Sequence, residues 1–224
     1  MKKFITNPFE KIEVLQKKII TEGVVFFESE LTTDSLLNQA KKLGSIYKHR
    51  DSHFDGITVI KSVYAPKETK SGYFGFTNSY LSLHTDRSTL KVVPNILIFY
   101  CKTNDCVGGE SILVDGKDLI NYFQTKYSET NCPLFYNNSV IFSDNSSFYK
   151  GSIFEKIGNK SYQLRFRNDE FSFFNPNVHS FLQEFYEVME DKKVEFKLKK
   201  NQGYIINNNR YLHGRKGFNG KREM

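Results

Sequence analysis

The feature that most constrains the fold is the wide separation of three side chains that can share one metal ion. His84 and Asp86 stand two residues apart, whereas His213 lies near the end of the 224-residue chain. In an extended segment, side chains two residues apart point to the same side, so His84 and Asp86 would share a face. Leu81 and Leu83 alternate with a polar residue just before them, which indicates a half-buried strand. The fold must bring His213 to the end of that strand to complete a metal site.

Two imidazoles and one carboxylate form the ligand set of non-haem Fe(II) oxygenases, which leaves coordination positions open. A His-x-Asp tripeptide alone is a weak signal, because a structural histidine beside a surface aspartate gives the same pattern. The second histidine strengthens it, since it stands in Asn-Asn-Arg-Tyr-Leu-His-Gly-Arg at residues 208–215.

The composition predicts one globular domain over residues 1–224. Hydrophobic residues make up 39% of the chain and aromatic residues 15%, which argues against disorder. The length suits one well-buried core. The formal charge of +7 comes mostly from scattered lysines, and the dense run at 197–200 is typical of a solvated face. Without a recognised reader motif, we expect no nucleic-acid partner.

Cysteine usage and the lack of long apolar runs predict a cytoplasmic protein. Cys101, Cys106 and Cys132 are odd in number and lack the paired spacing of a zinc site, so reduced thiols are expected. Residues 1–8 contain no apolar run of signal-peptide length, and no later stretch is long enough to span a bilayer. We therefore expect no membrane association.

Hydrophobic periodicity predicts a mainly β chain with flanking helices. Expected helices cover residues 7–20, 34–43, 119–127 and 178–189, the second capped by Thr32 or Thr33 and ended by Gly44. Expected strands cover 23–27, 57–60, 94–101, 140–142, 152–154, 161–167 and 194–198. A further strand begins at Ser111, and residues 202–206 form a turn and another strand. Residues 67–75 should form a loop near the site, either a lid or an idle surface loop.

Other polar residues outside the His84 stretch are weaker candidates. His49 and His53 are loosely spaced among acids and predict a solvated loop, and His179 falls off its helical stripe, so none receives a metal role. Arg165 and Arg167 would share one strand face, where two guanidinium groups bind a carboxylate or form an exposed polar face; both interpretations stay open.

Three motifs together resemble those of the taurine dioxygenase-like (TauD/TfdA) family of Fe(II)- and 2-oxoglutarate-dependent oxygenases. Leu83-His84-Thr85-Asp86 looks like the proximal metal motif, Gly108-Gly109-Glu110-Ser111 like the strand that helps hold the cosubstrate, and residues 208–215 like the distal metal motif. The resemblance covers most of the chain from Gly23 onward. It implies a double-stranded β-helix, or jelly roll, with helices bracing the larger sheet.

The resemblance also implies roles for single residues. His84, Asp86 and His213 would bind Fe(II), which 2-oxoglutarate chelates. An arginine beyond the distal histidine normally meets the C5 carboxylate of 2-oxoglutarate, and Arg222 is the best positional match, with Ser111 supplying a hydroxyl. Arg215 is the rival, although it follows His213 more closely than the usual pattern.

One departure concerns the end of the chain. Family members generally continue past this arginine into a final strand, whereas this sequence stops at Met224. The resemblance therefore leaves three expectations open: a cosubstrate pocket that lacks the usual C-terminal strand, a pocket closed by another chain in an oligomer, or a longer protein of which this sequence is a part with reduced activity.

The implied activity is an oxygenase that consumes O2 and 2-oxoglutarate and releases succinate and CO2. Halogenating relatives replace the metal carboxylate with a small residue, so the intact Asp86 favours hydroxylation, with desaturation and cyclisation still open. The expected substrate is a small polar metabolite such as a free amino acid, bound by Arg167 or Arg165 and by Asn78 or Thr77. The alternatives are a non-enzymatic jelly-roll binding protein and a metal-dependent hydrolase.

Overall fold

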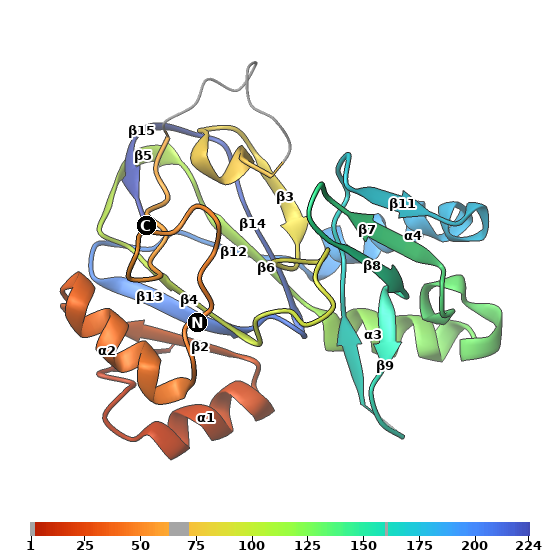
Figure 1. Ribbon diagram of the computed structural model, residues 1–224, viewed down its shortest axis with the longest axis horizontal. Helices are drawn as coiled ribbons and strands as arrows, with labels where there is room; N and C mark the ends of the chain where they lie inside the picture. Colours follow the sequence, from red (N-terminus) through yellow and green to blue (C-terminus); the bar gives the residue numbers. More distant parts are fainter. Residues whose placement is uncertain (1–2, 63–71, 160) are drawn as a thin grey trace.

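Two four-stranded sheets form the centre of the molecule in the computed structural model, which describes residues 3–62, 72–159 and 161–224 (Figure 1). The first sheet has the order β1 (Phe4–Thr6), β2 (Val24–Glu28), β13 (Gln202–Asn207) and β4 (Ile96–Tyr100). The second has the order β12 (Val194–Phe196), β6 (Ser111–Asp115), β14 (Tyr211–Arg215) and β3 (Leu81–His84). A separate antiparallel pair joins β15 (Phe218–Glu223) to β5 (Thr103–Gly108).

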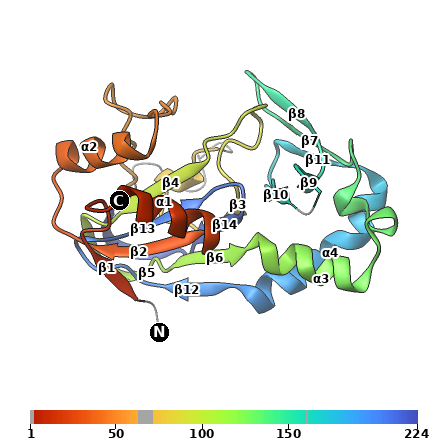
Figure 2. The same cartoon turned by 90° about the horizontal axis from the view of Figure 1, so that it is seen from below.

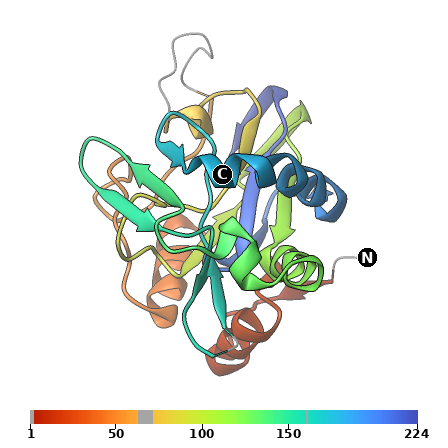
Figure 3. The same ribbon diagram turned by 90° about the vertical axis from the view of Figure 1, so that its right-hand side faces the viewer.

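Helices and small sheets occupy the two ends of the molecule (Figures 1 and 2). Helices α1 (Ile12–Thr21) and α2 (Thr33–Leu43) lie at one end. At the other end, α3 (Gly116–Lys126) and α4 (Pro176–Lys192) run side by side (Figure 3). Two small sheets lie at the same end: one has the order β11 (Ser172–Phe174), β7 (Val140–Ser143) and β8 (Phe148–Gly151), and the other pairs β10 (Tyr162–Leu164) with β9 (Phe154–Lys156). The 3-10 turns η3 (Glu129–Asn131) and η4 (Pro133–Phe135) follow α3, whereas η2 (Phe74–Phe76) precedes β3 beside the second central sheet (Figure 1).

The space between the two central sheets is filled by side chains from both. Tyr204 and Ile206 of β13 pack in one cluster with Leu113 of β6 and Tyr211 of β14, and Phe99 of β4 lies against it. Burial of these apolar faces against each other is what holds two stacked sheets together. The jelly roll expected from the sequence is therefore confirmed.

Local signals fix the helix boundaries. The side chain of Thr32 accepts a hydrogen bond from the backbone N–H of Ser35 at 3.1 Å, which caps α2, and Gly44 follows its last turn. Helix α1 begins at Ile12, later than predicted. The reason is that Asn7 has a φ of 48° and precedes a proline, which disfavours helical backbone at that position.

Three strand predictions were only partly right. Residues 57–60 form no strand; Ile60 instead exchanges backbone hydrogen bonds with Met224, beside an isolated bridge from Lys61 to Glu223. The strand expected over 161–167 ends at Leu164, and the one expected over 152–154 begins only at its last residue. Of the loop expected over 67–75, residues 67–71 lie outside the described residues.

Within the described ranges, none of the helices combines the length and the apolar character that crossing a lipid bilayer requires.

Candidate metal centre

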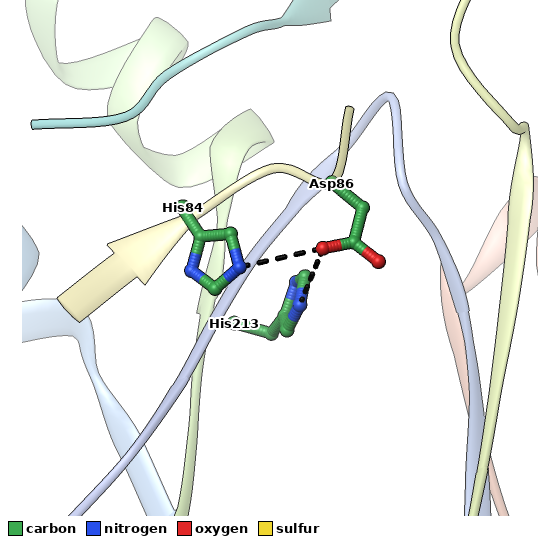
Figure 4. Close-up of side chains that lie close together, drawn as sticks. All are labelled: His84, Asp86 and His213. Carbon is green, nitrogen blue, oxygen red and sulfur yellow. Dashed lines mark ion pairs between the residues drawn. The ribbon is translucent and has the colours of Figure 1, made fainter. Parts of the chain in front are cut away.

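Neighbouring strands of the second central sheet bring the two distant histidines together (Figure 4). His84, the last residue of β3, is the direct cross-strand partner of His213 on β14, and their ring centroids lie 4.4 Å apart. Asp86 lies on the turn that follows β3. One of its carboxylate oxygens, Oδ1, lies 3.3 Å from Nε2 of His84 and 3.5 Å from Nε2 of His213. The three side chains therefore converge on one point.

Close approach of β14 to β3 depends on a glycine. A Cβ atom at Gly214 would lie 2.7 Å from the carbonyl oxygen of Leu81 and 3.3 Å from the backbone nitrogen of Leu83. Any larger residue next to His213 would push the strands apart. Glycine therefore stands at a position where the β14–β3 ladder has no room for a side chain.

Hydrogen bonds outside the cluster orient two of its members. Nδ1 of His84 lies 2.7 Å from the carbonyl oxygen of Ser82, so this nitrogen donates and Nε2 is left as the ligand atom. The side chain of Asn208 accepts from the backbone N–H of Asp86 at 2.9 Å and donates to the carbonyl oxygens of Asp86 and Pro94 at 3.1 and 2.9 Å. Sequence reasoning gave Asn208 no role of its own, although it opens the segment that contains His213.

The charge states of the cluster suit metal binding. Burial raises the pKa of Asp86, but hydrogen bonds with His213 and His84 outweigh it and hold that pKa well below its ordinary value. Burial, and then the neighbouring His84, lower the pKa of His213. At neutral pH the cluster therefore offers an anionic carboxylate beside a neutral buried imidazole, the forms in which these groups bind metals.

The spacing also fits a single ion. Ligand atoms of the three residues all lie within 4.8 Å of one another. For bonds of about 2.0–2.2 Å, two ligands at right angles on one ion stand about 3 Å apart. Small side-chain shifts would close the observed separations to that value, and the donor set is the one associated with Fe(II) centres that keep open positions.

Arg222 fits a buried anion. It is 7% exposed, and its side chain makes no hydrogen bond or ion pair within the described part of the chain; its Nε atom is buried without a partner. Burial lowers the pKa of this guanidinium. A desolvated cation without a partner is costly, so a carboxylate at this place would be favourable.

Aromatic side chains connect Arg222 and Ser111 to the metal cluster, although neither residue is among those that line the main cavity. Burial raises the pKa of Tyr204, whereas a hydrogen bond with Ser111 and the nearby charge of Arg222 act to lower it, which places both residues beside this ring. The Tyr204 ring stacks on Phe99 at 4.7 Å, and Phe99 lies 5.2 Å from the ring of His213.

Arg215 already has partners. Its guanidinium donates to the carbonyl oxygens of Gly75, Thr77 and Ser79 at 3.1, 2.8 and 2.8 Å. These bonds attach the segment before β3 to β14. The two candidate arginines therefore differ. Arg215 is hydrogen-bonded to backbone carbonyl groups, whereas the guanidinium of Arg222 has no hydrogen-bond or ion-pair partner among the described residues.

A cavity of about 950 Å³ opens beside the cluster. His84, Asp86 and His213 contribute to its lining, together with Arg167 and, contrary to the predicted solvated loop, His49. The lining also includes one face of α2, which carries Leu36, Leu37, Ala40 and Leu43. A small molecule in this cavity would have direct access to the ion that the cluster can hold.

The prediction that Arg165 and Arg167 lie on one face of a strand is wrong, because β10 ends before both of them. Arg165 is buried away from the cavity. It donates to the carbonyl oxygens of Ser88, Leu90 and Lys91 and stacks on the ring of Tyr149, with Cζ 3.6 Å from the ring centroid. Arg167 does line the cavity, where it forms an ion pair with Asp169.

Thr77 and Asn78 do not line the cavity either. The hydroxyl of the buried Thr77 donates to the carbonyl oxygen of Phe74 at 2.9 Å. Asn78 is exposed, and its carbonyl oxygen accepts from the backbone N–H of Phe218. Both residues shape the turn that precedes β3, and Arg215 then fixes this turn.

Known proteins share this fold and part of this sequence. Gamma-butyrobetaine dioxygenase from Homo sapiens is 28% identical over 166 residues, which cover 66% of this chain and 43% of that protein. The chain therefore spans less than half the length of the curated relative it matches.

Solved structures give the same fold at low sequence identity. An asparagine oxygenase solved with Fe(II), 2S,3S-3-hydroxyasparagine and succinate is 12% identical with a TM-score of 0.76, covering 94% of this chain and 76% of that one. PvcB, an Fe, alpha-ketoglutarate dependent oxygenase from an isonitrile synthetic pathway, is 16% identical with a TM-score of 0.71, covering 98% and 80%. At these identities the likeness shows the fold alone.

The model of one protein family matches residues 8–224, nearly the whole sequence. The chain belongs to the TauD, TfdA family of taurine catabolism dioxygenases.

Proposed function

We propose that this protein is an Fe(II)- and 2-oxoglutarate-dependent oxygenase that hydroxylates a small polar metabolite such as a free amino acid. The observation that carries the proposal is the convergence of His84, Asp86 and His213 at the wall of a cavity of about 950 Å³. Membership of the TauD, TfdA family supports it and disfavours a metal-dependent hydrolase or a non-enzymatic binding protein.

Each residue then has a task. His84, Asp86 and His213 would hold the metal at the wall of the cavity. Arg222 binds the C5 carboxylate of 2-oxoglutarate, and Ser111 adds a hydroxyl next to it. When bound, iron and 2-oxoglutarate supply the oxidising chemistry, in which O2 is consumed, succinate and CO2 are released and a substrate C–H becomes C–OH. Asn208 and the Ser82 carbonyl keep the ligands in place throughout.

The substrate class is supported by the cavity and by the relatives. Gamma-butyrobetaine dioxygenase and asparagine oxygenase are named for small molecules that carry a carboxylate. Arg167, although paired with Asp169, remains a candidate contact in the cavity lining. A cytoplasmic location is a further proposal, supported by the free thiols of Cys101, Cys106 and Cys132.

We also propose that residues 1–224 act as one domain. One apolar cluster contains Leu83, Val114 and Leu212 of the second central sheet together with Phe123 of α3 and Phe185 of α4. The helical end and the sheet that carries the metal ligands therefore share a core.

Two measurements test the activity. Succinate release by the purified protein should require Fe(II), 2-oxoglutarate and O2 together. In the absence of O2, addition of Fe(II) and 2-oxoglutarate should produce a visible charge-transfer band, because both must be bound at one centre for it to arise. Iron binding without this band would show that the likeness to oxygenases extends only to the fold.

A further inference from the structure

Arg87 directly follows Asp86 and lines the same cavity. Its φ of 57° lies in the left-handed region, which residues other than glycine rarely adopt. The turn is fixed on both sides of it: the buried Ser88 donates to the carbonyl oxygen of Thr85 at 2.7 Å, and the Thr85 hydroxyl accepts from the backbone N–H of Phe166. An unfavourable backbone conformation held by its surroundings marks a residue whose direction matters.

The other cations in the lining have acidic partners. Arg50 bonds Asp51 at 3.2 Å, Lys102 lies 3.5 Å from Glu223, and Arg167 pairs with Asp169.

Arg87 differs from these cations because its guanidinium makes no ion pair or hydrogen bond with any residue that the structure describes. Its Nε atom is buried without a partner. The nearest aromatic contact is the ring of Tyr47, 5.8 Å from Cζ.

Neither of the two titratable side chains next to Arg87, His49 and Asp86, is free to compete with or to neutralise it. His49 also lines the cavity; burial, and then Arg87 itself, lower its pKa, so its ring is neutral at physiological pH. Asp86 is committed to the two histidines of the metal cluster. A partly desolvated guanidinium with no partner is stabilised by an anion that arrives with the ligand.

We propose that Arg87 binds the carboxylate of the substrate and so selects small carboxylates, amino acids among them, for the neighbouring metal centre. This inference rests on the proposed function, because the reaction is defined by iron and 2-oxoglutarate. The planar fork of the guanidinium matches both oxygens of a carboxylate. Arg87 directly follows the metal ligand Asp86. A substrate whose carboxylate is bound to Arg87 would therefore place the rest of its atoms in the cavity, close to the metal cluster.

The test compares Arg87→Gln and Arg87→Lys with Lys91→Gln. Lys91 is exposed on the same loop and does not line the cavity, so its substitution removes the same charge without touching the site. Each protein is loaded with 2-oxoglutarate and Ni(II), which cannot support turnover. The twenty L-amino acids and gamma-butyrobetaine are then titrated by calorimetry.

At least one compound should bind wild type about 10- to 100-fold more tightly than Arg87→Gln, as expected for loss of a charge-assisted hydrogen bond to a carboxylate. Arg87→Lys should be intermediate, and Lys91→Gln should match wild type. The carboxamide of that compound should bind wild type as weakly as the acid binds Arg87→Gln. The inference is overturned if no compound distinguishes wild type from Arg87→Gln, or if that variant loses affinity for 2-oxoglutarate instead.

Failure of the proposed function would look different. It would appear in wild type as a missing charge-transfer band and no iron-dependent succinate, whatever the calorimetry shows. A wild-type band combined with carboxylate binding that is insensitive to Arg87 would overturn the inference alone.

Discussion

At the residue scale, the candidate metal site depends on side chains that are each fixed at a second atom. His84 is held through Nδ1 by the Ser82 carbonyl, and Asp86 through its backbone by Asn208. Nδ1 of His213 is buried and has no partner among the described residues, so its position depends on the β14 ladder. The three ligands are thus secured by three different means.

Replacing Asp86 with Ala should nearly abolish Fe(II) binding and hydroxylation, because the cluster of His84, Asp86 and His213 loses its anionic member. The loss of affinity should exceed the roughly 10- to 100-fold that removal of a ligand's outer hydrogen-bond partner costs. Anaerobic titration with Fe(II) measures it. His53→Ala and His179→Ala are matched controls, since both side chains are exposed and outside the cluster. Full iron affinity in Asp86→Ala would contradict the metal-site assignment.

Arg222→Ala and Arg215→Ala should fail in different ways. Arg222→Ala should raise the dissociation constant of 2-oxoglutarate by about 10- to 100-fold, since loss of a charge-assisted bond costs about 1.5–3 kcal/mol. Arg215→Ala should instead lower the free energy of unfolding of the metal-free protein, because three carbonyl oxygens lose their donor. Titration of the charge-transfer band with 2-oxoglutarate measures the first effect, and urea denaturation measures the second. A larger 2-oxoglutarate effect from Arg215→Ala would reverse the assignment.

At the element scale, the pairing of β3 with β14 creates the site. Direct opposition of His84 and His213 requires this register, and a register irregularity between His213 and Arg215 follows at once. The sheet β12-β6-β14-β3 supports the pair on its other side through β6. Shifts of a few tenths of an ångström between these two strands would be transmitted directly to the ligand atoms.

Gly214→Ala should therefore weaken both iron binding and stability. The added methyl group would lie 2.7 Å from the Leu81 carbonyl oxygen, so β14 must move away from β3. Overpacking of this kind typically costs about 1–3 kcal/mol. Gly44→Ala is the control, because an added Cβ there has nothing within 4 Å. Urea denaturation and Fe(II) titration should detect loss only in Gly214→Ala; equal behaviour of the two variants would contradict this account.

At the scale of the whole molecule, two fully buried thiols should lower the free energy of unfolding when the pH becomes alkaline. Burial raises the pKa of Cys101 and of Cys132 from 9.0 to about 11. Between these values the unfolded chain has lost protons that the folded protein still holds. The free energy of unfolding should therefore fall as the pH rises from about 9 to about 11.

Each pKa unit corresponds to about 1.4 kcal/mol, so each thiol contributes roughly 2–3 kcal/mol to this loss. Urea denaturation at several pH values measures the slope. Cys101→Ala and Cys132→Ala should each make the slope between about pH 9 and about pH 11 less steep while lowering stability at neutral pH. An unchanged slope in both variants would show that other groups control alkaline unfolding.

Sequence by itself determined the local arrangement. The two-residue spacing of His84 and Asp86, the Thr32 cap of α2 and the strand that begins at Val194 are set by neighbouring residues, whose periodicity and capping act over a few positions. The family motifs are also short and local. They were therefore sufficient to predict the family and, with it, the jelly roll.

Only the tertiary structure decided which polar side chains are free to bind ligands. Arg165 and Arg215 donate hydrogen bonds to carbonyl groups about 75 and 140 positions away in the chain. Among the described residues, the side chains of Arg222 and Arg87 make no such hydrogen bonds. A long side chain reaches whichever distant backbone the fold brings beside it. Hydrogen-bond satisfaction in the interior is therefore a property of non-local packing, which residue spacing does not encode.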